Sequence, residues 1–236
     1  MRNLRNLIAS ALVVAIAPAS LAAQAFAGTG MASNVSGGVD GRWMVSCKAL
    51  FSVVNVGPCT GTDAVPTFAP ASVITATPGG WAAVPLGANG LRYIGAVANG
   101  SVGGSDGENP RYEYTFRTTF TGAAGAQLEL NPLRIDNYWV GYILNGGALQ
   151  TGGFVGLPPL AANGGNWMTP FVLIINTGLV AGVNTLDIKM TGNGRTDGIL
   201  LDGRLNVVPE PSTYALMATG LLGLGGVVRR RRLPKV

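Results

Sequence analysis

The sequence predicts an all-β domain, an antiparallel two-sheet sandwich, between two apolar terminal segments. Apolar and polar residues alternate over short runs, which is the pattern of half-buried strands. Turn residues interrupt these runs, the chain holds 36 glycines, and only 11% of its residues are charged. No stretch of residues 28–208 keeps a 3.6-residue apolar period long enough for a substantial helix. About ten short strands in one domain are typical of a sandwich or jelly roll.

The first half of the domain contains weak strand signals and one strong one. We expect short strands at 42–46, 51–56, 81–84 and 91–97, where apolar residues lie between turn residues. The strongest alternation follows at 111–120. Its apolar face is predicted to carry Tyr112, Tyr114, Phe116, Thr118 and Phe120, and its polar face Arg111, Glu113, Arg117 and Thr119.

The second half of the domain predicts a hairpin and further strands. Tyr138–Leu144 runs into Asn145-Gly146, a strong signal for a type I′ turn, with 148–155 as the return strand. Phe171–Ile175 is a continuous apolar strand suited to a sandwich core. Alternating segments at 126–130, 186–190 and 199–207 complete the predicted set of strands.

Two cysteines, Cys47 and Cys59, are separated by 11 residues, and the chain contains no histidine. In a chain that leaves the cytoplasm such a pair predicts a disulfide rather than a metal site. Closing a loop of this size stabilises the folded state by about 3 kcal/mol in the loop-entropy description.

Residues 1–27 have the three parts of a signal peptide. Two arginines among the first five residues precede an apolar helical stretch at 7–17, and Ala25-Phe26-Ala27 forms a small-x-small cleavage site. We therefore expect cleavage to leave Gly28 as the first residue. A permanent anchor is the alternative, but Pro18 interrupts the apolar stretch early.

Residues 209–236 read as a sorting tail. Pro209 and Pro211 flank Glu210 and keep the backbone there extended. The apolar run 214–228 would span about 22 Å as a helix, which is short against a hydrocarbon core of about 30 Å. We expect a short transmembrane helix, held on the cytoplasmic side by Arg229, Arg230, Arg231 and Arg232.

This tail resembles the PEP-CTERM sorting tail of Gram-negative bacteria in all three of its parts. The resemblance implies an exosortase as the partner, a membrane enzyme thought to cut near Pro209-Glu210-Pro211. It also implies transient anchoring in the inner membrane, a destination at the cell surface or in the extracellular matrix, and an association with exopolysaccharide and biofilm. An ordinary C-terminal anchor is the alternative.

The basic charge of the chain belongs to its terminal segments. The whole chain has a formal net charge of +5, but residues 28–208 carry nine basic and ten acidic side chains. A nucleic-acid-binding domain would need a basic surface. We therefore expect no nucleic acid as a partner.

The sequence offers little catalytic chemistry. The chain contains no histidine, which excludes a Ser-His-Asp triad, a Cys-His pair and histidine-based metal sites. A glycosidase needs two facing carboxylates, and no spacing of the acidic residues pairs two of them. We expect no enzyme, no cofactor and no metal.

Residues 110–207 resemble the galactose-binding-domain-like jelly roll. The resemblance rests on an aspartate-led strand, Asp136-Asn137-Tyr138-Trp139, on the Asn145-Gly146 hairpin, and on the later segment Gly182-Val183-Asn184-Thr185-Leu186. It implies a two-sheet fold that binds carbohydrate without catalysis. Residues 40–43 would supply an early strand of the same domain.

An aromatic side chain beside polar ones is the usual chemistry of a sugar site. Asp136, Asn137, Tyr138, Trp139 and Trp167 are the candidate carbohydrate-binding residues. Because Tyr138 and Trp139 are adjacent on a strand, they point to opposite faces, and one of them belongs to the core. The sequence thus predicts an exported glycan-binding protein. The alternative is a structural or adhesive surface protein that binds no sugar specifically.

Overall fold

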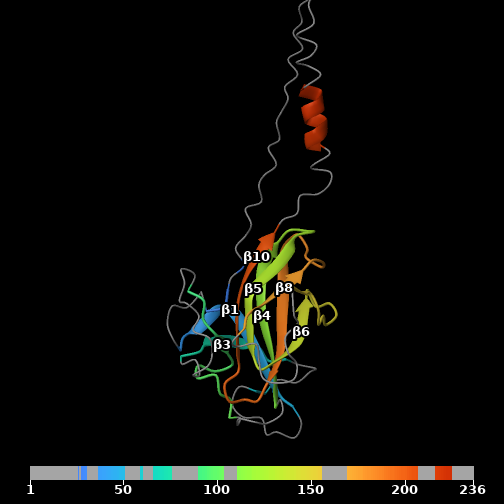
Figure 1. Ribbon diagram of the computed structural model, residues 1–236. Coiled ribbons are helices and arrows are strands. Elements are labelled where there is room, and N and C mark those ends of the chain that lie inside the picture. Colours follow the sequence, from blue (N-terminus) through green and yellow to red (C-terminus); the bar gives the residue numbers. More distant parts are fainter. Residues whose placement is uncertain are drawn as a thin grey trace, which may run out of the picture.

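The computed structural model describes residues 26, 28–30, 37–50, 59–60, 66–75, 90–103, 111–155, 169–206 and 216–224. Ten strands in this part of the chain form one antiparallel sheet (Figure 1). Their order across the sheet is β6-β9-β4-β1-β2-β3-β10-β5-β8-β7. The strands are β1 (Val39–Ala49), β2 (Ala69–Val73), β3 (Ile94–Gly95), β4 (Tyr112–Gly122), β5 (Gln127–Asp136), β6 (Tyr138–Leu144), β7 (Phe154–Val155), β8 (Phe171–Ile175), β9 (Gly182–Gly192) and β10 (Gly198–Asn206).

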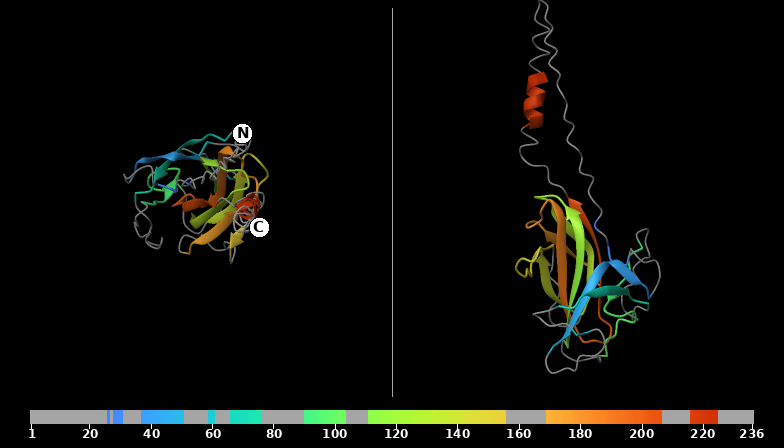
Figure 2. Two further views of the ribbon diagram at one scale, coloured as in Figure 1. Left: turned by 90° about the horizontal axis from the view of Figure 1, so that it is seen from above. Right: turned by 180° about the vertical axis from the view of Figure 1, so that it is seen from behind.

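The sheet curls until its two ends meet, as the view from above shows (Figure 2). The ring of Trp139 on the end strand β6 packs edge-on against Phe154 on β7 and Phe171 on β8, with centroids 5.4 and 5.9 Å apart. One large cluster of buried side chains fills the inside of the curl. The predicted antiparallel β fold is confirmed. The division into the two sheets of a galactose-binding-like jelly roll stays a prediction.

Strand β4 shows how the sequence pattern produces the two faces. Tyr112, Tyr114 and Phe116 are at most 1% exposed and point into the core, as the alternation predicts. The residues between them are half-buried and lie on the outer face. β4 lies between β1 and β9 and pairs with each of them over many residues. The outer face of β4 is therefore flanked by two long strands.

The predicted hairpin is correct in its turn and wrong in its return strand. Asn145 and Gly146 have φ values of 52° and 69°, as a type I′ turn requires. Within residues 148–155, all of them described, only Gln150 bridges back to Tyr142 of β6. Phe154–Val155 forms β7 instead, which pairs with β8 at the opposite end of the sheet. Phe154 still contacts β6 through the Trp139 ring, but its backbone pairs with β8.

The predicted early strands differ more from the structure. The expected strand at 91–97 shrinks to the two residues of β3. β2 was not predicted, and its Pro70 lacks the backbone N–H that a central strand uses. It nevertheless lies between β1 and β3 in the sheet. The expected strands at 51–56 and 81–84 lie outside the described residues.

The two cysteines are joined as the sequence predicts. A disulfide connects Cys47 on β1 to Cys59, and both side chains belong to the buried core. Next to the disulfide, Lys48 on β1 forms an isolated β-bridge with Thr60. The disulfide and the β-bridge together hold the chain around Cys59 against strand β1.

The terminal segments are described only in part. Residues 216–224, inside the predicted apolar run, form a short helix. Among the residues that the structure describes, no helix has the length and apolar character needed to span a membrane. The predicted signal helix, the Pro209-Glu210-Pro211 motif and Arg229 to Arg232 lie outside the described residues.

Candidate functional site

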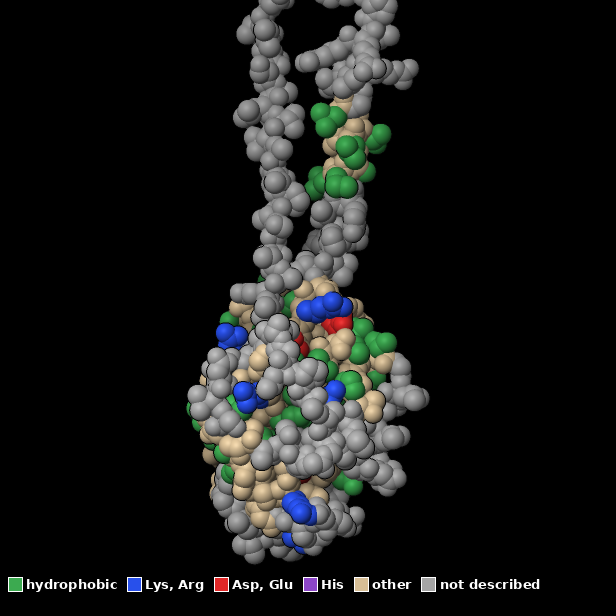
Figure 3. Space-filling model, turned by 60° about the vertical axis from the view of Figure 1, so that its left-hand side comes forward, with side chains coloured by type: hydrophobic (Ala, Val, Ile, Leu, Met, Phe, Trp, Pro, Cys, Tyr) green, Lys and Arg blue, Asp and Glu red, His purple; other side chains and the backbone are tan. Residues whose placement is uncertain are grey.

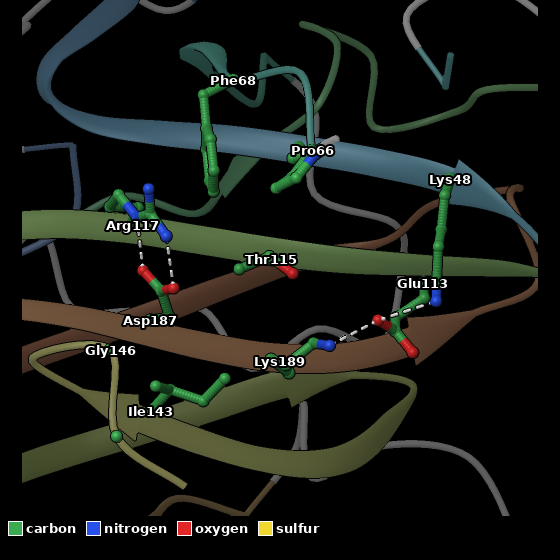
Figure 4. Close-up of a pocket in the computed structure, with 12 residues that line it drawn as sticks. Lys48, Pro66, Phe68, Glu113, Thr115, Arg117, Ile143, Gly146, Asp187 and Lys189 are labelled. Atoms are coloured by element: carbon green, nitrogen blue, oxygen red, sulfur yellow. Dashed lines mark hydrogen bonds and ion pairs between the residues drawn. The ribbon is translucent and has the colours of Figure 1, made fainter. Parts of the chain in front are cut away.

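A groove of about 270 Å³ lies on the outer face of the sheet (Figure 4). Strands β1, β4, β9 and β6 form its floor. The segment with Pro66 and Phe68 rises on one side, and the Gly146-Gly147 turn lies on the other. The groove is lined by Ser46, Lys48, Pro66, Phe68, Glu113, Thr115, Arg117, Ile143, Gly146, Gly147, Asp187 and Lys189.

Strand register brings the charged residues of the groove together. Glu113 on β4 lies directly opposite Lys48 on β1. On the other side of β4, Arg117 lies opposite Asp187 on β9. Directly opposed residues on one face of an antiparallel pair have Cβ atoms about 5 Å apart, within reach of an ion pair. The polar alternation of three strands thus produces one charged surface.

Arg117 and Asp187 form a two-pronged ion pair in the groove. Arg117 Nε donates to Asp187 Oδ1 and Arg117 Nη2 to Asp187 Oδ2, each over 2.7 Å. The hydrogen bonds to Asp187 raise the pKa of Arg117, and partial burial opposes this rise. The guanidinium also lies over the Phe68 ring, 4.1 Å from its centroid. One cation therefore orders both a carboxylate and an aromatic ring.

A second charge cluster lies at the other end of the groove. Glu113 Oε1 is 2.7 Å from Lys189 Nζ and 3.3 Å from Lys48 Nζ. All three side chains are one-fifth exposed or less, so they are partly shielded from water. Together the two clusters present both hydrogen-bond donors and acceptors to a molecule in the groove.

The structure describes two of the three aromatic residues expected to bind sugar, Tyr138 and Trp139. The ring of Trp139 is half-buried among Phe154 and Phe171, and Trp139 Nε1 donates to the Thr151 carbonyl over 3.3 Å. Tyr138 is half-buried too. Trp167 lies outside the described residues. Sugar contact at these three aromatic residues stays a prediction.

Asp136 and Asn137 belong to a polar cluster around a buried carboxylate. Asp136 is buried at the end of β5, and the Asn137 side-chain amide lies between the carboxylates of Asp136 and Asp197. Asp197 is 1% exposed and accepts hydrogen bonds from Tyr114 Oη and the Gly194 backbone N–H, each over 2.7 Å. Burial raises the pKa of Asp197 to about 6, although these hydrogen bonds act against the rise.

This cluster holds the turn between β9 and β10 against the core. Gly192 packs so closely on Asp197 that a Cβ at position 192 would overlap the Asp197 carboxylate. The described residues contain no group of three or more acidic or cysteine side chains placed to hold a metal ion. The arrangement is that of a structural anchor.

Sequence reasoning missed the groove, although a signal for it was present. The 111–120 pattern put Glu113 and Arg117 on one face, and 186–190 put Asp187 and Lys189 on one face. Opposite charges on the polar faces of two alternating strands suit neighbours in a sheet. Phe68 and Pro66 had no such signal, because only the folded chain brings them beside β4.

Surface charge beyond the groove is dispersed. On the face shown in Figure 3, the cationic side chains of the described residues lie apart from one another. Of the ion pairs outside the groove, Arg204 and Glu129 lie 2.8 Å apart, with the Arg204 side chain 69% exposed. Among the described residues, no broad basic surface gathers on this face.

Comparison with known proteins identifies the tail. Residues 207–232 match the PEP-CTERM protein-sorting motif. No curated protein and no solved structure matches the chain. The motif indicates an exported protein that is targeted to an exosortase and anchored transiently in the membrane before processing.

Proposed function

We propose that the exported β domain binds an extracellular glycan, without catalysis, in the groove over β1, β4, β9 and β6. The observation that carries this proposal is the presence of Phe68 beside two clusters of paired charges in one groove. The biofilm or exopolysaccharide matrix is the proposed destination, since a PEP-CTERM tail belongs to exported proteins.

The groove suits the two-sided chemistry of a sugar ring. The C–H groups of a sugar form an apolar face that packs on an aromatic or aliphatic surface, here Phe68, Pro66 and Ile143. Hydroxyl groups around the ring both donate and accept hydrogen bonds. Carboxylates accept them, and lysine and arginine side chains donate them.

Paired charges also prepare the groove for binding. Arg117 is fixed by Asp187 and by the Phe68 ring, and Glu113 is fixed by two lysines. Side chains that are ordered before binding lose less conformational entropy when the ligand arrives. Three cationic and two anionic side chains line the groove, which favours a neutral or acidic polysaccharide over a basic ligand.

We expect binding without catalysis because the two carboxylates of the groove are already engaged in ion pairs. Glu113 and Asp187 are both held in ion pairs with cationic side chains. The chain contributes no histidine that could serve as an acid or base. A structural or adhesive surface protein, which recognises protein partners instead of sugar, is the alternative that the experiment must separate.

Glycan binding is tested by calorimetric titration of the exported full chain. The probes are alginate as an acidic polymer, dextran as a neutral polymer, and the extracellular polysaccharide of the producing organism. We expect saturable binding to at least one of them, weakened at least tenfold by Phe68→Ala and by Lys189→Met. Both variants change side chains at the surface of the groove, so the fold should persist.

Two further variants locate the site. Arg204→Met removes a cation of the exposed Arg204–Glu129 pair outside the groove and should leave binding unchanged. Trp167→Ala tests the site expected from the sequence. If Trp167→Ala alone abolishes binding, the glycan site lies at Trp167 and not in the groove. Absence of binding to all three probes by folded protein would reject glycan binding and favour the structural alternative.

A further inference from the structure

Phe26 is a core residue of the β domain. Its side chain is 3% exposed, and its ring packs edge-on against Phe120 and Trp43, with centroids 5.2 and 6.1 Å apart. Across from these rings, a Cβ at Gly203 would lie 2.8 Å from the Phe26 ring. A side chain at position 203 on β10 would therefore collide with Phe26 and Leu130.

The residues that follow Phe26 are fixed in the sheet as well. The Thr29 backbone N–H donates to the Leu201 carbonyl over 2.8 Å, and the Leu201 N–H donates to Thr29 Oγ1 over 3.1 Å. The Arg92 N–H donates to the Thr29 carbonyl, and the Gly30 N–H to Asp40 Oδ2 over 2.6 Å. The domain thus includes Phe26, which the boundary expected from the sequence leaves out.

This placement conflicts with cleavage after Ala27. Such a cut would remove Phe26 and leave a space lined by Trp43, Phe120 and Gly203. Losing a large buried aromatic side chain is among the most destabilising changes that a core can undergo. A second small-x-small site, Ala23-Gln24-Ala25, ends at Ala25, directly before Phe26. Cutting there keeps the aromatic ring.

We propose that the signal peptide is removed by hydrolysis of the Ala25–Phe26 peptide bond. The protease is the membrane-bound signal peptidase of the export machinery, and the co-reactant is water. Water adds to the Ala25 carbonyl carbon and the C–N bond breaks. Ala25 keeps the water oxygen in its new carboxylate, and the Phe26 nitrogen takes both water protons and becomes the α-ammonium group of the mature chain.

The first test is N-terminal sequencing of the full chain after export. The expected sequence is Phe-Ala-Gly-Thr. A sequence that begins Gly-Thr-Gly would overturn the proposal, as would a start upstream of Phe26. Two matched leucine substitutions separate the neighbouring sites, because bulky residues are poorly accepted at the small positions. Ala23→Leu should slow removal of the signal peptide at least tenfold, whereas Ala27→Leu should leave it unchanged. The reverse result would also overturn the proposal.

A second test measures the thermal stability (Tm) of the exported protein. If Phe26 is retained, Phe26→Ala should lower the Tm by about 10 °C, since it empties a core site. Gln24→Ala alters a residue that the proposed cut removes, so the Tm should not change. A Tm unaffected by Phe26→Ala would show that Phe26 is absent from the mature protein. Neither test depends on glycan binding.

Discussion

The two faces of β4 hold two aspartates in opposite ways. On the outer face, Arg117 binds Asp187 of β9 in the groove. On the inner face, Tyr114 binds Asp197, which follows β9, by a single hydrogen bond of 2.7 Å. Asp187 is buried too, but its partner is a full positive charge on a side chain that is 39% exposed, whereas the donors to Asp197 are uncharged. The comparison shows that burial and partner, more than residue type, decide what an aspartate contributes.

The expected energies follow from that difference. An ion pair near the surface contributes little, because water already solvates both charges in the unfolded chain. Asp197 instead satisfies buried donors that have lost their water, and these donors would cost free energy if they were left without a partner. The buried carboxylate also resists ionisation, which makes its contribution depend on pH. Four changes test this contrast.

The largest expected effect comes from removing the buried carboxylate. Asp197→Ala leaves the Tyr114 hydroxyl and the Gly194 N–H without their acceptor inside the protein. We expect a loss of about 4 kcal/mol in the free energy of unfolding, measured by denaturant titration at neutral pH. Tyr114→Phe, which removes one donor and spares the carboxylate, should cost about 1 kcal/mol. Equal losses in the two variants would contradict the role given to Asp197.

A pH dependence follows from the pKa of Asp197, raised by burial from 3.8 to about 6. The folded protein holds this proton more tightly than the unfolded chain does. The resulting stabilisation is complete below about pH 4 and is lost as the pH rises through 6, a change of about 3 kcal/mol. Stability of the wild type relative to Asp197→Asn should therefore fall by this amount between about pH 4 and about pH 7. A difference that does not vary with pH would contradict the buried state of Asp197.

Gly192→Ala probes the packing around the same carboxylate. The added Cβ would overlap Asp197 and push it away from its donors. We expect a loss of about 2 kcal/mol in the free energy of unfolding. Gly41→Ala is a matched control in β1, because its Cβ would meet no heavy atom within 4 Å. A similar loss in both variants would point to a general cost of the substitution in a strand.

The smallest expected effect is the coupling in the groove. A double-mutant cycle with Arg117→Ala and Asp187→Ala should give a coupling of about 1 kcal/mol, since the Arg117 side chain is 39% exposed. The coupling should weaken at high salt. The more exposed Arg204–Glu129 pair serves as the control and should couple by about 0.3 kcal/mol. A coupling energy for Arg117–Asp187 larger than the coupling energy of the buried Tyr114–Asp197 pair would contradict the view that the buried pair contributes more.

Much of the fold could be predicted because the signals are local. Strands Tyr138–Leu144 and Phe171–Ile175 have the predicted bounds. The face of β4 that carries Tyr112, Tyr114 and Phe116 is buried as the alternation requires. The alternation of apolar and polar residues within one strand predicts which of its side chains are buried, and it does not depend on the neighbouring strands.

The candidate site was predicted less well. Sugar contact at Trp139 stays a prediction, but the sequence did not show that the curl of the sheet brings Phe154 and Phe171 against its ring. Phe154 itself was placed in the wrong hairpin. Neighbours across the sheet depend on strand order, which no local pattern encodes.

By itself, the sequence determined the alternating strands, the tight Asn145-Gly146 turn and the sorting tail, because each depends on residues close together in the chain. Tertiary structure alone decided that Phe68 lies beside Arg117, that Asp197 is buried under Tyr114, and that Phe26 belongs to the core. These contacts join residues far apart in the chain. They form only when the curled sheet removes both partners from water, and their energies arise from that burial.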